Sequence, residues 1–539
     1  MSSGPSTCRG ESHAPLAGTR RADEASRTAV RPGTVGLALA GAAALYGASV
    51  LLGRFIRLWP WTVDDAFITF RYARHLAEGR GLQWNPGDTP AEGFTSLLWV
   101  LVSVIPHRFH IDVPAFAKVV SLVALGCSAA LAALVAWHLL RDAGRDLRLV
   151  VGGATALVVA AHPMTAVHAS SGMETALFTC LATALAYSAV SYRAFPSRRG
   201  AWSLALLSLL LGLARPEGNL LAGTVLVGLT IAQAGRGNGI GLVRPVLLAY
   251  VIPGSIYFVA RWAFYGLLLP LPFYIKSSAG WEGVDQVIGF YRHAVGWICL
   301  PALLGFLSFW RRTWPLALAT LLHSIFYLKP AHMMGFSWRY LYPCFPILVL
   351  AAGLAIARVL RSRPWLAVAA TCLGAVVTVY AHGRGADATI EDHVAYARGL
   401  ARAHVRLGRE LAALSERFPG ASPRLVVADA GAIPYYSDWW VLDSFGLNDR
   451  EIARTGVRDL SYIYGASPDA VVILSRSAQT IDLRLGWEGP IAAEAQRLGY
   501  KVGGIYEFGA PHARPFGGYY LWLLMRPDLM ELLDPSGAP

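Results

Sequence analysis

The amino-acid sequence predicts a polytopic α-helical membrane protein that ends in a soluble α/β domain. The 539 residues are 55% hydrophobic and only 15% charged, whereas a soluble chain averages about 25% charged residues. The apolar residues come in repeated runs, each close to the roughly 20 residues that a helix needs to cross the hydrocarbon core. Beyond about residue 385 these runs stop, and helical segments alternate with short β-rich segments.

The N-terminal segment 1–31 is rich in Ser, Pro, Gly and Arg. Such a composition cannot bury a core, so we predict a disordered, basic cytoplasmic tail. The next run, Gly33–Leu52, is too long for a signal peptide and lacks a cleavage site. It is therefore predicted to be the first span of a transmembrane domain over 32–384.

Ten further runs bring the prediction to about eleven transmembrane helices. They are 114–140, 147–162, 173–191, 201–214, 218–235, 245–264, 293–310, 313–328, 341–359 and 364–381.

The loops between these runs alternate in character, and this alternation predicts the topology. One set carries the basic clusters around Arg141, Arg193, Arg236, Arg311 and Arg358. The positive-inside rule places that set in the cytoplasm and the other loops outside. The outside loops, which carry aromatic, acidic and histidine residues, are 59–113, 163–172, 215–217, 265–292 and 329–340.

The apolar segment Phe94–Ile105 tests this topology, because counting it as a span would reverse every later loop. It is short, so we interpret it as a re-entrant or interfacial helix on the outer face. The segment 385–539 is then predicted to be one small extracytoplasmic α/β domain. Its expected strands are Arg424–Ala428, Trp439–Leu442, Ala470–Leu474, Val502–Phe508 and Tyr519–Leu524.

The net charge of +13 would suggest a nucleic-acid partner in a soluble protein. Here the basic residues lie in short loops between apolar runs, and no nucleic-acid-binding signature is present, so we expect no nucleic-acid partner. The six cysteines are scattered, which argues against a disulfide framework. His162, His168 and Glu174 fit no zinc spacing. We therefore predict no metal and no cofactor.

The strongest candidate for chemistry is the pair Asp64-Asp65, just past the first span, followed by an expected helix that runs to about Glu78. A carboxylate there could remove a proton from a sugar hydroxyl as that hydroxyl attacks an activated carbon. The alternative is structural, with Asp65 capping the helix and Asp64 favouring its dipole. The sequence does not say which aspartate is the base.

Four basic residues near the outer edge of the bilayer are candidate ligands for a donor phosphate: Arg71, Arg74, Lys276 and Arg339. Arg71 and Arg74 lie one helical turn apart, so both could face one anion. An arginine fork suits a phosphate leaving group because it binds two oxygens and stays charged. For Arg339 the alternative is snorkelling to lipid headgroups.

Four further residues are candidate substrate contacts: Arg215, Glu217, Tyr265 and His332. Arg215 and Glu217 flank Pro216 in an outer turn, where a structural Arg–Glu pair is the alternative. Tyr265 lies where interfacial aromatic residues are expected in any membrane protein.

In this order, these elements resemble the lipid-linked sugar transferases of the GT-C fold. They are most similar to the terminal arabinofuranosyltransferase of mycobacterial cell walls and its bacterial relatives. The islands that carry the resemblance are Asp64-Asp65, Phe70-Arg71, Glu78-Gly79, Asn85-Pro86-Gly87, Glu92-Gly93-Phe94-Thr95-Ser96, Ala214-Arg215-Pro216-Glu217, Tyr265-Gly266, Leu269-Pro270, Arg339 with Pro343, Ala428-Asp429-Ala430-Gly431, Pro434-Tyr435-Tyr436-Ser437 and Val441-Leu442-Asp443 through Gly446-Leu447-Asn448-Asp449.

The resemblance implies an inverting glycosyltransferase of the cytoplasmic membrane with an outward-facing cavity. Asp64 or Asp65 would be the base, and the donor would be a polyprenyl-phosphate sugar such as arabinofuranose. The acceptor would be a cell-envelope glycan or glycolipid. The chain reads His332-Met333-Met334 where the arabinosyltransferases carry Gly-Gly-Asp, which puts the sugar identity in doubt more than the reaction type.

Two other functions compete with this one. The first is transfer of mannose or another sugar to protein. The second is a transporter or lipid-sugar flippase, but transporters tend to show internal repeats and intramembrane charges. This chain shows no evident repeat and keeps its charges at the outer edge, which disfavours transport.

Overall fold

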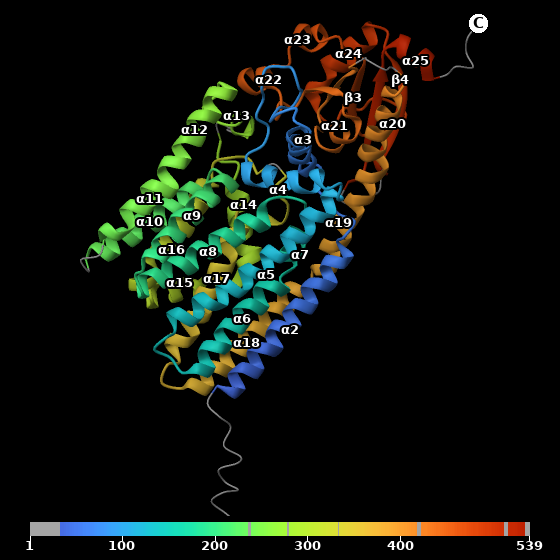
Figure 1. Cartoon of the computed structure of the whole chain (residues 1–539). Coiled ribbons are helices and arrows are strands. Elements are labelled where there is room, and N and C mark those ends of the chain that lie inside the picture. The colour runs from blue at the N-terminus through green and yellow to red at the C-terminus, as the bar shows by residue number, and fades with distance from the viewer. Residues whose placement is uncertain are drawn as a thin grey trace, which may run out of the picture.

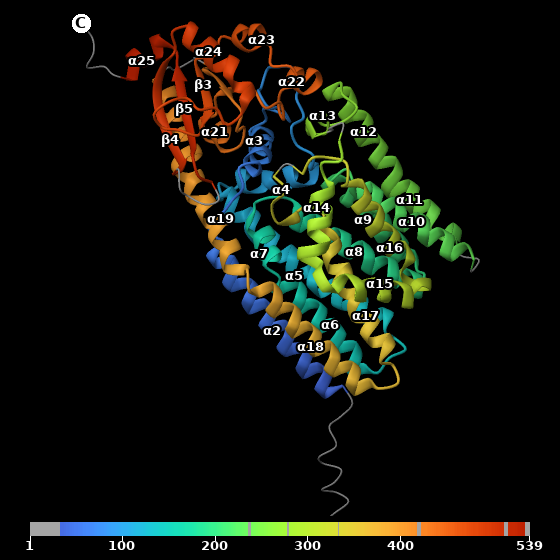
Figure 2. The same ribbon diagram turned by 180° about the vertical axis from the view of Figure 1, so that it is seen from behind.

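The computed structural model describes residues 33–235, 239–276, 280–332, 334–417, 422–510 and 516–533. The predicted tail 1–31 lies outside these ranges. The protein is a bundle of long helices with an α/β domain at one end, and helices α3 and α4 lie between the two (Figure 1). Figure 2 shows the sheet of this domain from behind.

Helices occupy all eleven of the predicted membrane runs. They are α2 (Thr34–Arg57), α5 (Val113–Leu139), α6 (Arg145–Ala161), α8 (Thr175–Ala194), α9 (Arg198–Ala214), α10 (Gly218–Ala234), the continuous stretch Val243–Tyr265 that ends in α12 (Ile252–Tyr265), the stretch Val284–Ser308 that ends in α15 (Cys299–Ser308), α16 (Trp310–Phe326), α17 (Phe345–Val359) and α18 (Pro364–Gly383).

Among the described residues, seven helices are long and apolar enough to cross a membrane, or eight if α6 and α7 (Pro163–Ser170), bent by 59°, form one broken span. Helices α9, α10 and α16 have 17 residues each, about 25 Å at 1.5 Å per residue. The count of eleven spans therefore stays a prediction.

The outer surface of α12 shows why the bundle needs a lipid environment. Ile256 and Val259 are 64% and 58% exposed, and their neighbours along the helix are similarly bare. Exposed apolar surface costs about 25 cal/mol per Å² in water, and hydrocarbon removes that cost. Both views place α12 at the edge of the bundle (Figures 1 and 2).

The loop after the first helix contains α3 (Ala66–Ala77) and α4 (Leu97–Arg108). Helix α3 ends where expected, because Gly79 and Gly81 adopt φ values of +76° and +85° that disfavour other residues. The 12 residues of α4 span only about 18 Å, and its first turn is capped by Ser96, which accepts a hydrogen bond from Trp99 N. This length fits an interfacial helix, although the side of the membrane stays a prediction.

A long helical segment leads from the bundle into the C-terminal domain through α19 (Ala386–Leu400), η7 (Ala401–Val405) and α20 (Arg406–Ser415). The sheet order is β2-β1-β3-β5-β4, with β1 parallel to β2 and β3, and β5 antiparallel to β3 and β4. The strands, each within two residues of its predicted bounds, are β1 (Arg424–Val427), β2 (Trp440–Asp443), β3 (Ala470–Ser475), β4 (Lys501–Gly509) and β5 (Tyr519–Met525).

Short helices complete the domain: α21 (Ala432–Ser437), α22 (Arg450–Thr455), α23 (Leu460–Gly465), α24 (Gly489–Arg497) and α25 (Pro527–Leu533). One hydrophobic core unites this domain with the first loop, since Phe67, Tyr72 and Trp84 pack in the same cluster as Ile433 and Trp439. The first loop and the C-terminal domain therefore share one hydrophobic core, which also reaches residues of the bundle such as Leu51 and Ala117.

Candidate active site

The two aspartates at the start of α3 occupy different environments. Asp64 is buried, and its Oδ1 accepts a hydrogen bond of 2.8 Å from Ala432 N in the C-terminal domain. Asp65 is partly exposed, and its carboxylate has no hydrogen bond or ion pair within the described ranges. Asp65 occupies the N-cap position, but its side chain makes no capping hydrogen bond. The structural alternative is therefore confirmed for the position of Asp65, but not for a capping hydrogen bond.

Burial raises the pKa of Asp64 to about 6, against the opposing effect of His404 and with the help of Asp429. Asp64, the carboxylate that the fold holds in place, is thus also the carboxylate whose ionisation is disfavoured by burial. Asp65, in contrast, keeps its oxygens available for a ligand.

Arg71 and Arg74 both bind the C-terminal domain. Arg71 is buried, lies 4.6 Å above the Trp84 ring and donates to the carbonyl oxygens of Trp84, Pro434 and Trp439. Arg74 donates to the Tyr435 carbonyl at 2.8 Å and pairs with Asp438 at 2.6 Å. These contacts explain both arginines as supports of the junction, so we assign the donor phosphate elsewhere.

Arg215 lies at the centre of a buried ion-pair network. It donates to Glu174 and to Glu217, and Tyr327 donates to Glu217 as well. The Arg–Glu pair expected as the structural alternative is therefore present, with Glu174 as an additional partner. The Arg215 guanidinium also lies 5.1 Å from the centre of the Tyr340 ring, so its charge faces the next cluster.

Arg339 and Lys276 converge on Tyr340. Arg339 Nη2 donates to Tyr340 Oη at 2.8 Å, and Lys276 Nζ donates to the same oxygen at 3.3 Å. Arg339 is only 4% exposed, yet its Nε and Nη1 have no hydrogen-bond partner among the described residues. A buried guanidinium with open donors is costly unless an anion completes it.

The charges around Arg339 place it near the catalytic candidates. Burial lowers the pKa of Arg339, but Tyr340, Glu174 and Asp65 outweigh burial and raise it. Burial likewise raises the pKa of Tyr340, while Arg339, Lys276 and Arg215 outweigh burial and lower it. Three cations thus surround one phenol, and the carboxylate of Asp65 lies within electrostatic reach of Arg339.

The chain segment before Arg339 is strained. Met334, Ser337 and Trp338 have φ values of +50°, +46° and +52°, which cost non-glycine residues free energy. His332 borders the cluster, with its Nε2 2.8 Å from the Tyr327 carbonyl and its ring edge-on to Tyr340. Strain of this kind persists only where surrounding contacts impose it, and the strained segment leads directly into Arg339.

Tyr265 and Glu92 anchor the first loop to α12. Tyr265 Oη donates to the Leu82 carbonyl at 2.9 Å, and Arg261 pairs with Glu92 at 2.8 Å while both are buried. Tyr265 therefore supports the loop rather than pointing at the Arg339 cluster.

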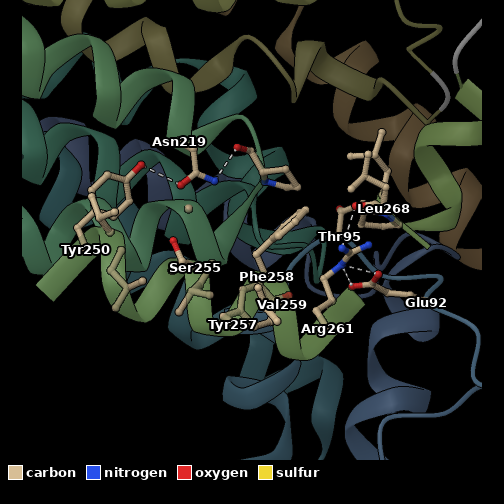
Figure 3. A pocket seen from close by; sticks show the side chains of 18 residues that line it. Glu92, Thr95, Asn219, Tyr250, Ser255, Tyr257, Phe258, Val259, Arg261 and Leu268 are labelled. Atoms are coloured by element: carbon tan, nitrogen blue, oxygen red, sulfur yellow. Dashed lines mark hydrogen bonds and ion pairs between the residues drawn. The ribbon is translucent and has the colours of Figure 1, made fainter. Parts of the chain in front are cut away.

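A groove of about 570 Å³ lies between α12 and the α9–α10 pair. Figure 3 shows the Glu92–Arg261 pair at one end and Asn219 with Tyr250 at the other, with Phe258 between them. Leu213 and Pro216 also line this groove. Arg215, between them in the chain, turns its side chain to Tyr340, so the groove and the cationic cluster flank the same turn.

Sequence reasoning did not single out Tyr340, Tyr396 or His404, and it noted Glu174 only in connection with zinc. No group of three metal-ligating side chains occurs in the part of the chain that the structure describes. Spacing could not reveal Tyr340 or His404, because each contacts partners distant in the chain.

Comparisons with known proteins identify the fold. The structure of ArnT from Cupriavidus metallidurans bound to undecaprenyl phosphate matches with a TM-score of 0.57 and 14% identity, covering 91% of this chain and 99% of that one. Its apo state matches with a TM-score of 0.58, 14% identity, and 91% and 98% coverage. The apo oligosaccharyltransferase of Archaeoglobus fulgidus matches with a TM-score of 0.51, 13% identity, and 81% and 69% coverage.

These likenesses show that this chain has the fold of ArnT and of the archaeal oligosaccharyltransferase, the GT-C fold. Residues 394–519 match a family described as a domain of unknown function (DUF8728). No curated protein matches the chain.

Proposed function

We propose that this protein is an inverting glycosyltransferase of the cytoplasmic membrane. It transfers a sugar, arabinofuranose or a similar pentofuranose, from a polyprenyl-phosphate donor to a cell-envelope glycan or glycolipid on the outer face. The observation that carries this proposal is the buried Arg339 guanidinium, whose Nε and Nη1 have no partner among the described residues.

In this reaction a hydroxyl oxygen of the acceptor forms a bond to the anomeric carbon of the donor. The bond from that carbon to the phosphate oxygen breaks, and its electron pair leaves with polyprenyl phosphate. Arg339 and Lys276 would bind the phosphate as its negative charge grows. Cations already placed for that charge need no rearrangement during the reaction.

Asp65 is the residue we assign as the base. It is partly exposed and without a partner in the described ranges, whereas Asp64 is held by Ala432 N. The proton of the attacking hydroxyl would pass to Asp65, and a placed carboxylate contributes about 10²–10⁴ in rate. Asp64 orients the turn that carries it.

The isoprenoid chain of the donor would lie in the groove along α12. The groove is mostly apolar, and α12 lies at the edge of the bundle, so a lipid could enter from the bilayer. That ArnT was solved with undecaprenyl phosphate supports a lipid carrier for this fold.

The test is turnover by the purified protein with polyprenyl-phosphate arabinofuranose and, in parallel, polyprenyl-phosphate mannose. Release of polyprenyl phosphate together with a glycosylated acceptor supports the proposal, and the preferred donor identifies the sugar. Movement of the intact donor across vesicles without release of phosphate would establish a flippase instead and overturn it.

A further inference from the structure

A second cluster of ionisable groups lies on the domain side of Asp64 and has no part in the mechanism above. His404 Nε2 donates to Asp429 Oδ2 at 2.8 Å, and Tyr519 Oη donates to the same oxygen. His404 is 2% exposed, and its Nδ1 has no hydrogen-bond partner in the described part of the chain. These residues come from η7, from the loop after β1 and from β5.

The loop after β1 carries this cluster directly onto Asp64. Two residues beyond Asp429, Gly431 is so close to Asp64 that a Cβ at Gly431 would lie 2.2 Å from the Asp64 carbonyl oxygen and 2.3 Å from its Oδ2. The next residue, Ala432, donates its N–H to Asp64 Oδ1. On the opposite side, Tyr396 Oη accepts a hydrogen bond of 3.1 Å from Asp64 N. The domain therefore grips both the side chain and the backbone of Asp64.

Within the described ranges, the charged and titratable groups that act on Asp64 come from several elements. Asp65 comes from its own turn, Tyr396 and His404 from the α19–η7 helix, Asp429 from the loop after β1, and Tyr519 from β5. Arg484 lies behind, 4.4 Å from the Tyr519 ring, and acts on Asp429. The imidazole of His404 thus binds the partly exposed Asp429 and acts electrostatically on the buried Asp64.

A junction that only joined α3 to the C-terminal domain would not require these ionisable side chains. Burying like charges is costly, and apolar residues of similar volume usually serve as well or better. Arg71 and Arg74 already join α3 to the domain. The cluster instead sits where its charge acts on the residue next to the proposed base.

We propose that His404 and Asp429 are positioning residues for the transfer reaction, which hold Asp64 in place so that the neighbouring Asp65 is aimed at the acceptor. This inference rests on the proposed function. An ionised Asp64 accepts the hydrogen bond from Ala432 N more strongly than a neutral acid does, so a charged Asp64 holds the turn that carries Asp65 more firmly. The protonated imidazole of His404 favours ionisation of Asp64. His404 therefore lowers the pH above which Asp64 is charged and holds the turn.

The direction of each expected change with pH follows from the groups around Asp64. Because the pKa of Asp64 is about 6, the wild-type kcat should rise as the pH increases through about 6. His404→Gln removes the cation that lowers the pKa of Asp64, so the midpoint of this rise should move up by about one pH unit. Asp429→Asn, which loosens the loop that grips Asp64, should lower kcat about 10-fold with little change in the KM for the donor.

The experiment compares pH profiles of kcat for wild type, His404→Gln, Asp64→Asn and the double variant. Glu410→Gln is the matched control, because Glu410 also accepts from a strand tyrosine, Tyr506, but outside the cluster. We expect the upward shift in His404→Gln alone, no shift in the control, and no further shift when Asp64→Asn is already present.

A loss of activity in His404→Gln that is equal at every pH, or a shift that persists in the double variant, would overturn the inference. If the wild type transfers no sugar from any lipid donor, the proposed function fails instead. The coupling of His404 to Asp64 can still be measured from the melting temperature: His404→Gln should shift its pH dependence in the wild-type background and not beside Asp64→Asn.

Discussion

The loop that carries α3 and the loop that ends at Arg339 both place arginines near the outer edge of the helical bundle, yet they use them in opposite ways. In the first loop, Arg71 and Arg74 donate to carbonyls and a carboxylate of the C-terminal domain. In the second, Arg339 is buried with open donors. The sequence shows arginines both at a domain junction and at the proposed anion site. Only the partners of each arginine in the fold distinguish the two uses.

The largest expected effect concerns the side of the membrane on which both loops lie. A phosphatase fused after Pro539 should be active, and a cytoplasmic reporter at the same place should be silent, because the charge alternation places 385–539 outside. The response is all or none. An active cytoplasmic reporter would place both loops inside and remove the basis for an outer-face reaction.

Replacing the proposed base comes next. Asp65→Asn should lower turnover by about 10²–10⁴, since the attacking hydroxyl loses its proton acceptor. Asp64→Asn should cost less, because Asn keeps an oxygen that accepts from Ala432 N. Turnover of each purified variant, with donor binding measured alongside, checks the order. Equal losses would show that the two aspartates act as one unit, and a larger loss for Asp64→Asn would reverse the assignment.

Replacing the two kinds of arginine should impair different properties: use of the donor for Arg339, and stability for Arg71. Charge-assisted contacts to phosphate are worth about 1.5–3 kcal/mol, so Arg339→Ala should weaken use of the donor about 10- to 100-fold with little loss of melting temperature. Arg71→Ala removes the hydrogen bonds that Arg71 donates to three carbonyls and should lower the melting temperature. Donor affinity and melting temperature measured on both variants test the comparison, which fails if Arg71→Ala is stable but cannot bind polyprenyl phosphate.

The smallest expected effect is on stability. The pKa of Asp64 rises from 3.8 to about 6 on folding, so the folded protein binds more protons than the unfolded one between about pH 4 and 6. Its contribution to the free energy of unfolding therefore falls as the pH rises through that window. Asp64→Asn should flatten this dependence in thermal melts between pH 4 and 7, whereas Asp482→Asn, at an exposed site, should leave it unchanged.

Much of the fold could be predicted from the sequence because it depends on local patterns. Apolar runs located the long helices, short β-rich runs located the five expected strands, and Gly79 marked the end of α3. The separation of Asp64 from Asp65 could not be predicted, since it depends on Ala432, 368 residues further along the chain. The same holds for the open donors of Arg339, which are defined by what fails to reach them.

The candidate site residues show the same division between local patterns, which could be predicted, and tertiary contacts, which could not. Lys276 and Arg339 were recognised as cations at the outer edge, but their convergence on Tyr340 requires a contact across 64 residues. Arg71 and Arg74 were placed on one helical face, as they are, yet the sequence could not show that this face meets a protein domain rather than a ligand. The spacing of residues along a helix predicts which side chains point the same way, but only the tertiary fold determines what those side chains contact.

The grip of Gly431 and Ala432 on Asp64 has a consequence for biosynthesis. Asp64 emerges from the ribosome early, whereas the loop that holds it is translated 368 residues later, after every predicted membrane helix. A nascent or prematurely terminated chain thus displays its acidic pair without the surface that orients it. The acidic pair therefore takes its final arrangement only after the C-terminal domain has been made and has folded against it.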